Sequence, residues 1–152
     1  MRLTAHIDIG APPAVVWRCI DEPALILRWV EGALEHRYID TRDPAHPVGQ
    51  RFLQRLQQGK KVTEFTGTLI AFDRPRHFAF TIPSPAYSSE AHFRLSPRGA
   101  AGTHVDYVID VTLHTTLAKL AAALLRLPLS FFVPKQMRRL KALAESVKGE
   151  AP

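Results

Sequence analysis

The sequence is poor in cysteine and lacks the histidine patterns that usually bind metals. Cys19 is the only cysteine in 152 residues, so neither an internal disulfide nor a cysteine-only metal site can form. The seven histidines form no HExxH motif and no pair on one helix face. Residues 1–10 lack the apolar run and the cleavage site of a secretory signal. We therefore expect no metal, no cofactor and a reducing, cytoplasmic location.

The sequence also lacks a long uncharged apolar run. Its most apolar stretch, residues 117–133, contains Lys119, Arg126 and a central proline, whereas a membrane span needs about 20 apolar residues. We therefore expect no transmembrane segment. Phe131 and Phe132 could pack across the end of a sheet, contact a membrane surface transiently or join two copies, so a monomer and a homodimer both stay open.

Acidic residues are in the minority, with 14 Asp and Glu against 20 Lys and Arg, which gives a formal net charge of +6. This charge permits attraction to nucleic acid, anionic lipid or an acidic ligand without selecting one of them. The aromatic residues lie on apolar faces and do not alternate with Lys or Arg, as a stacking platform for single strands requires. We therefore do not expect a nucleic-acid partner.

What is present is a pattern of short strands in a chain of ordinary globular composition. Hydrophobic residues make up 46% and charged residues 22%, which is typical of a protein that buries one core. We expect a single domain over residues 1–152. Period-two alternation, bounded by turn residues, predicts strands at residues 2–9, 34–40, 50–57, 61–72, 77–82, 87–95 and 103–114. The short connections between the later strands require antiparallel neighbours, and residues 41–49 form a longer irregular loop.

Helical spacing appears at both ends of the chain. Prolines open two short helices after the first strand, at residues 14–20 and 24–30. After residue 114 the apolar period becomes helical again and continues to about Lys148. Pro128 and Pro134 should break or kink this last helix.

Three segments carry a resemblance to a known family. Residues 7–17 (IDIGAPPAVVW), 27–29 (LRW) and 67–80 (GTLIAFDRPRHFAF) resemble the START-like (SRPBCC, helix-grip) superfamily, in its polyketide cyclase/dehydrase-like or lipid-transfer branch. The resemblance implies an α+β helix-grip fold, in which a curved antiparallel sheet of about seven strands wraps around a long C-terminal helix. Two short helices lie between its first and second strands. Such proteins include lipid carriers and aromatases or cyclases, and the fold does not choose among them.

Residue parity identifies the side chains that should face the cavity of such a fold, because alternate residues of a strand face opposite sides. Phe78, Phe80 and Ile82 share one face, and so do Tyr87 and Phe93. The parity of residues 61–72 stays open, since Phe65 and Leu69 compete with Ile70 and Phe72 for the inner face. The candidate ligand-binding residues are Trp29, Arg55, Phe65, Phe80, Tyr87, Phe93 and Tyr107, although an aromatic residue on such a face is more often plain core than a ligand contact.

The sequence favours binding over catalysis. An apolar lining with two tyrosine hydroxyls suits a small hydrophobic molecule, such as a lipid, an isoprenoid or an aromatic, polyketide-like compound. The alternative is a polyketide cyclase/aromatase-like enzyme, in which Tyr87 or Tyr107 orients the substrate and Arg55 or Glu64 assists proton transfer. An ionisable group within hydrogen-bond reach of either tyrosine would favour this enzyme. The sequence identifies no catalytic residue.

Overall fold

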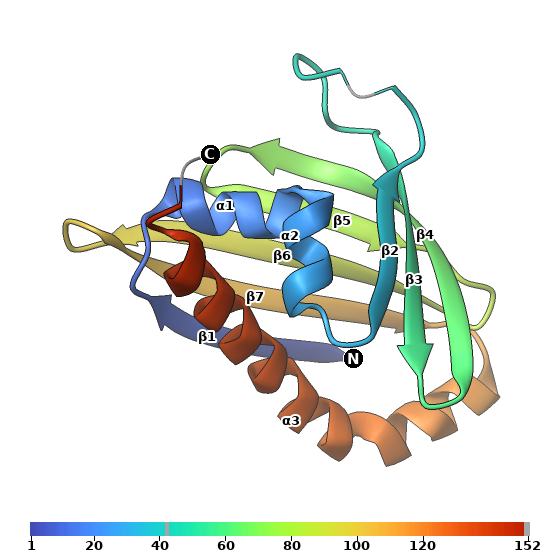
Figure 1. Cartoon of the computed structure of the whole chain (residues 1–152). Helices are drawn as coiled ribbons and strands as arrows, with labels where there is room; N and C mark the ends of the chain where they lie inside the picture. Colours follow the sequence, from blue (N-terminus) through green and yellow to red (C-terminus); the bar gives the residue numbers. More distant parts are fainter. Residues whose placement is uncertain (42, 151–152) are drawn as a thin grey trace.

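The computed structural model describes residues 1–41 and 43–150, which form a seven-stranded antiparallel sheet and three helices (Figure 1). The strands follow the order β1-β7-β6-β5-β4-β3-β2 across the sheet, and the helices lie on one face of it. This arrangement confirms the predicted α+β fold with its two short helices after the first strand. The elements are β1 (Arg2–Ile9), α1 (Pro13–Asp21), α2 (Pro23–Trp29), β2 (Ala33–Tyr38), β3 (Arg51–Gln58), β4 (Lys61–Asp73), β5 (His77–Ile82), β6 (Tyr87–Arg98), β7 (Gly102–Leu113) and α3 (Thr116–Val147).

The predicted element bounds differ from the observed ones mainly at one hairpin. Strand β6 continues to Arg98, three residues beyond its predicted end, because Arg98 still pairs with Gly102 of β7. The described residues of the loop predicted at 41–49 are irregular, as expected, while Arg42 lies outside the described residues. Residues 151 and 152 also lie outside them, and the single domain over residues 1–152 stays a prediction.

A bulge in β4 resolves the open parity of this strand. The pairing of β4 with β5 shifts register between Leu69 and Ala71, and a bulge of this kind reverses which residues face inward beyond it. Leu69 is buried before the bulge, and Phe72 packs against the core after it. Ile70, at the bulge itself, is exposed. Phe65 and Leu69 therefore face inward before the bulge, and Phe72 faces the core after it.

Trp17 of α1 is the centre of the core at the end of the sheet where β1 leads into α1. Its side chain is fully buried and meets the rings of Phe72 and Phe78 edge to face, with ring centroids 5.1 and 5.5 Å apart. Such edge-to-face contacts are favourable beyond the burial of apolar area alone. They hold α1 against β4 and β5 and close this end of the molecule.

Of the two effects predicted for the prolines of the C-terminal helix, the break is wrong and the kink is present. Pro128 and Pro134 both lie inside one continuous helix of 32 residues. The helix does change direction between its orange and red parts in Figure 1, because proline removes a hydrogen-bond donor and crowds the preceding turn. The start of the helix is capped by Thr115, whose hydroxyl oxygen accepts a hydrogen bond from the Ala118 N–H at 3.0 Å.

The two halves of α3 differ sharply in burial. The second half packs against β1 and α1 through the buried residues Val133, Gln136, Met137, Leu140, Leu143, Ala144 and Val147. The first half carries large exposed apolar side chains, among them Leu117 and Leu124. The second half therefore belongs to the core, and the first half extends over the opening of the sheet.

Candidate ligand cavity

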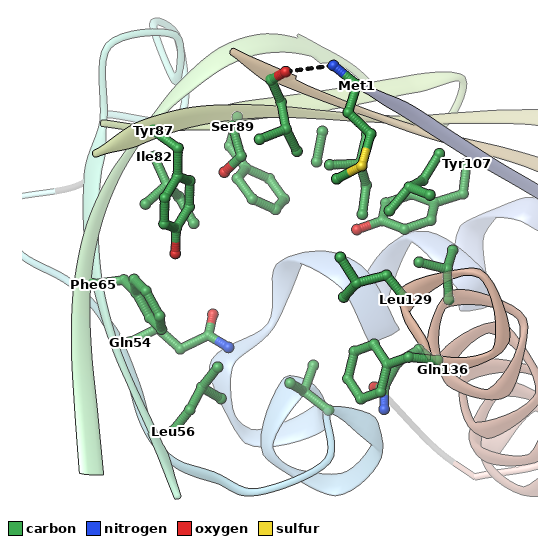
Figure 2. A pocket seen from close by; sticks show the side chains of 18 of the residues that line it. Met1, Gln54, Leu56, Phe65, Ile82, Tyr87, Ser89, Tyr107, Leu129 and Gln136 are labelled. Carbon is green, nitrogen blue, oxygen red and sulfur yellow. Dashed lines mark hydrogen bonds between the residues drawn. The ribbon is translucent and has the colours of Figure 1, made fainter. Parts of the chain in front are cut away.

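A cavity of about 770 Å³ lies between the inner face of the sheet and the first half of α3. Every strand contributes side chains to its wall, and α2 and α3 complete it (Figure 2). The lining is mostly apolar because the inward residues of β5, β6 and β7 are aromatic or aliphatic. Its volume lies within the range of about 300–1,000 Å³ that is typical of small-molecule sites.

Six of the seven predicted site residues line this cavity. Three of them form a cluster on one wall. The Trp29 indole N–H donates a hydrogen bond to the Cys19 carbonyl oxygen at 2.8 Å, which fixes its ring against Phe93. The rings of Phe93 and Tyr107 lie side by side, with centroids 4.4 Å apart. The six residues are Trp29, Phe65, Phe80, Tyr87, Phe93 and Tyr107, and their role in binding stays a prediction.

The placement of Arg55 in the cavity is wrong. Its neighbours on β3, Gln54 and Leu56, both line the cavity, so the parity of the strand turns Arg55 to the outer face. There its guanidinium lies 3.6 Å from a carboxylate oxygen of Glu35. Glu64, which pairs with Arg55 across the sheet, is exposed and does not line the cavity either. Neither residue can assist proton transfer inside the cavity.

The Tyr107 hydroxyl is a polar group aimed into an apolar space. Figure 2 shows it pointing into the cavity from the sheet. Among the described residues, no side chain or backbone group forms a hydrogen bond with it, whereas burial raises the pKa of this hydroxyl well above its usual range. The group is therefore a neutral hydroxyl at all physiological pH values, available to a polar atom of a bound molecule.

Tyr87 places a second hydroxyl at the cavity, from the start of β6. Its side chain is partly exposed, and in Figure 2 its hydroxyl also points inward. None of the hydrogen bonds found in the described part of the chain joins either tyrosine hydroxyl to an acid, a histidine or an arginine. The two hydroxyls are thus placed for binding and lack the ionisable partner that proton transfer would need.

A pair of polar residues that the sequence reasoning missed lies on the opposite wall. His36 of β2 and Gln54 of β3 face each other across the two strands, with 3.2 Å between the imidazole Nδ1 and the amide oxygen. The amide oxygen can only accept, so Nδ1–H donates. Burial lowers the pKa of His36, although the hydrogen bond with Gln54 opposes this shift. The imidazole is therefore neutral near pH 7, and the amide of Gln54 points into the cavity (Figure 2).

Gln136 provides a further polar group, from the inner face of α3. Its side chain is buried, and its amide oxygen accepts a hydrogen bond from the Glu31 N–H at 3.3 Å. Lys135 lies 3.2 Å from the Glu31 carboxylate. These contacts attach α3 to the segment after α2, where that segment borders the cavity.

The sequence did contain signals for the missed residues. Gln54 lies two residues from both Phe52 and Leu56, and this alternation places it on the same face as two apolar residues. Gln136 follows Val133 by three residues and precedes Leu140 by four, which is the spacing of the buried stripe. A polar residue at an apolar position of a strand or helix therefore indicates a site residue. Burying an unpaired amide is costly, so such a residue needs a partner in the protein or in a ligand.

The described residues hold no group of three or more His, Cys, Asp or Glu side chains close enough to bind a metal ion. Helix α3 is long and apolar enough to cross a membrane by length and composition alone, a criterion that many core helices also meet. The qualifying stretch of 18 residues is only 6% buried, whereas the second half of the helix is packed into the core. The expected absence of a transmembrane segment stays a prediction.

Comparisons with known proteins identify relatives of this cavity-forming fold. The family model described as "Polyketide cyclase / dehydrase and lipid transport" matches residues 1–145. No curated protein matches the chain significantly. Among solved structures, the Zhui aromatase/cyclase from Streptomyces sp. R1128 has a TM-score of 0.78 at 12% identity, over 97% of this chain and 94% of that one.

Two further structures have similar scores. The protein TTHA0849 from Thermus thermophilus has a TM-score of 0.77 at 15% identity, over 98% of this chain and 100% of its own. A START superfamily protein from Mycobacterium smegmatis has a TM-score of 0.71 at 12% identity, over 96% of this chain and 98% of that one. Identities this low support the common fold and leave the ligand and the activity open.

Proposed function

Since the chain belongs to the polyketide cyclase/dehydrase and lipid transport family, we propose that it binds and carries a small hydrophobic molecule in the cavity between its sheet and α3. The supporting observation is the cavity of about 770 Å³, in which a few polar groups stand in an apolar wall. Such a wall favours a lipid-like, isoprenoid or aromatic, polyketide-like compound with one or two polar atoms. We place this function in the cytoplasm, where a buried free thiol such as Cys19 stays reduced.

The polar groups indicate where those polar atoms would lie. Tyr107 offers a hydroxyl on one wall, and Gln54 offers amide N–H groups on the other. A ligand that satisfied both would gain two hydrogen bonds in surroundings of low polarity, where such bonds discriminate strongly. A ligand made only of hydrocarbon would leave both groups without a partner.

Retention of a ligand tests the proposal directly. Native mass spectrometry of freshly purified protein, before and after extraction with organic solvent, should show a hydrophobic mass that extraction removes. Titration of the extracted protein with the apolar fluorophore N-phenyl-1-naphthylamine then measures the cavity itself.

Two adjacent serines of β6 provide a matched pair of variants. Ser89 lines the cavity, whereas the Ser88 hydroxyl lies on the outer face, 2.8 Å from the imidazole of His114. Ser89→Trp should place an indole ring inside the cavity and weaken fluorophore binding roughly ten-fold or more, while Ser88→Trp should leave the affinity unchanged. Equal affinities for the two variants would show that the fluorophore binds elsewhere and would count against carriage in this cavity.

A second candidate function, cyclase-like proton transfer, is favoured by the neutral imidazole of His36. A lowered pKa leaves its Nε2 free to accept a proton near pH 7. Exchange of the acidic C–H protons of 1-phenylbutane-1,3-dione for deuterium, followed by NMR, tests this candidate. Acceleration by the protein that His36→Gln abolishes, while fluorophore binding is kept, would favour catalysis. No acceleration would leave carriage as the function.

A further inference from the structure

A stripe of apolar side chains runs along the outer face of α3, away from the cavity. It consists of Leu120, Leu124, Leu127 and Phe131, whose exposed fractions are 62%, 82%, 68% and 70%. Their spacing of four, three and four residues puts them on one face of a helix. None of them lines the cavity, whereas Leu125 and Leu129 between them do.

The charge of the surrounding segment has a single sign. Residues 111–144 contain no Asp or Glu and six Lys or Arg, which equals the net charge of +6 of the whole chain. Four of these cations lie beyond Pro134. Lys119 and Arg126 lie in the first half of α3, seven residues apart and therefore on the same side of the helix. Within the described residues neither forms an ion pair or a side-chain hydrogen bond.

We propose that this outer stripe, with Lys119 and Arg126 beside it, docks onto the surface of an anionic lipid bilayer. A helix with an apolar face and flanking cations lies in the plane of the interface, with its apolar side chains among the acyl chains. Lys and Arg side chains are long enough to place their charges at the level of the headgroups. Anionic lipid supplies the negative charge that this segment lacks.

Charge also argues against a second copy of this chain as the occupant. Two copies paired through this helix would bring two cationic segments together without an acidic residue between 111 and 144 to offset them. Like charges across an interface oppose association. A bilayer of anionic lipid has the opposite sign and no such penalty.

The mode of binding is peripheral. Met137 and Leu140 in the second half of α3 are buried in the core, and drawing them into a bilayer would require the domain to unfold. The first half alone is shorter than the stretch of about 20 residues that a span needs. The same half also lines the cavity through Ala121 and Leu125, so docking would bring the cavity wall to the membrane. The docking proposal rests on the outer surface and does not require a ligand.

Vesicle flotation tests the proposal with the full chain and two lipid compositions. Vesicles of phosphatidylcholine with 30% phosphatidylglycerol should bind the protein, and vesicles of phosphatidylcholine alone should bind it far less. The double variant Leu124→Ser, Phe131→Ser should lose roughly ten-fold or more in affinity for the vesicles. Each change removes a large apolar side chain that docking would bury among the acyl chains. Its matched control, Val48→Ser with Ile70→Ser, changes exposed apolar residues outside α3 and should bind as the unaltered protein does.

A second pair of variants tests the charge. Lys119→Gln with Arg126→Gln should weaken binding to the anionic vesicles by about five-fold per cation. Arg74→Gln with Arg98→Gln makes the same change in net charge outside α3 and should have a much smaller effect. Binding should also weaken at 0.5 M salt, where charges are screened over about 4 Å.

Four results would overturn the proposal. The first is equal binding of both lipid compositions, and the second is equal loss in the stripe variant and its control. The third is protein that resists release by an alkaline wash, which would indicate a span. The fourth is light scattering that shows a dimer dissociated by the stripe variant, which would assign the stripe to a second copy. Fluorophore binding by all variants, measured separately, keeps a failure of docking distinct from a failure of the proposed carriage.

Discussion

Deleting one oxygen from Tyr38 should lower the stability of the protein, whereas deleting one from Tyr107 should not. The Tyr107 hydroxyl has no partner among the described residues, so Tyr107→Phe removes a polar group from an apolar wall. Burying such a group without a hydrogen bond costs about 1–3 kcal/mol in proteins. The free energy of unfolding of the ligand-free protein should therefore stay unchanged or rise by up to about 2 kcal/mol.

Tyr38 is the matched control, because its hydroxyl is bonded. It donates to the buried carboxylate of Asp21 at 2.8 Å. A hydrogen bond to a charged group contributes about 1.5–3 kcal/mol, so Tyr38→Phe should lower the free energy of unfolding by that amount. Urea unfolding followed by circular dichroism gives both values, provided that the slope against denaturant is unchanged.

Binding should show the complementary effect at Tyr107. The probes naphthalene and 2-naphthol have the same ring system and differ by one hydroxyl, and each can displace N-phenyl-1-naphthylamine. One hydrogen bond of about 0.5–1.5 kcal/mol makes 2-naphthol the tighter ligand by roughly two- to twelve-fold, and Tyr107→Phe should remove that advantage. Destabilisation of the ligand-free protein by Tyr107→Phe of more than about 1 kcal/mol would refute the reasoning, since it would mean that the hydroxyl is already bonded.

Three further substitutions or measurements test other parts of the fold. Gly67→Ala should destabilise the protein by about 1–3 kcal/mol in urea unfolding, because a Cβ atom there would lie 2.3 Å from the Phe52 ring; unchanged stability would mean that the ring moves freely. The pKa of Glu145 is lowered first by Lys141 and then by the Gly10 N–H. Glu145→Gln should therefore cost about 1 kcal/mol at pH 7, allowing for partial exposure. This difference in the free energy of unfolding should hold above the ordinary glutamate pKa of 4.5 and vanish as the pH falls through the lowered pKa of Glu145 in the folded protein. A difference that is independent of pH would exclude the charge of Glu145 as its source. Burial raises the pKa of Cys19 to about 11, so Ellman's reagent at pH 8 should label the folded protein roughly a hundred-fold more slowly than the unfolded one, and rapid labelling of folded protein would contradict this.

The strands could be predicted from the sequence because their two faces differ in chemistry. On β6 the inward residues Tyr87 and Phe93 alternate with polar ones, and the alternation fixes the parity. On β4 the same reasoning could not decide, because the bulge between Leu69 and Ala71 changes the parity within one strand. A bulge depends on how two strands pair, so the pattern of one strand does not reveal it.

The errors at the site have a common physical origin. Arg55, a predicted ligand-binding residue, lies on the outer face beside Glu35. His36 and Gln54, which do line the cavity, satisfy one another across two strands. Such a pair arises from the register of β2 against β3, which neither strand encodes alone.

The course of α3 explains why Pro128 and Pro134 kink this helix without breaking it. Pro128 and Pro134 cannot donate to the carbonyls one turn before them, so the helix is weakened within one short region. The carbonyls that lose a donor are those of Leu124 and Ser130. Between the prolines the Ser130 hydroxyl donates to the Leu127 carbonyl at 2.6 Å, a side-chain bond of the kind that often bends a helix. Core packing fixes the direction of the helix beyond the second proline, and the bend allows the part before the first proline to follow the cavity. Stability and the cavity wall thus depend on different halves of one helix, so substitutions in the first half can change the cavity and its outer stripe without unfolding the domain.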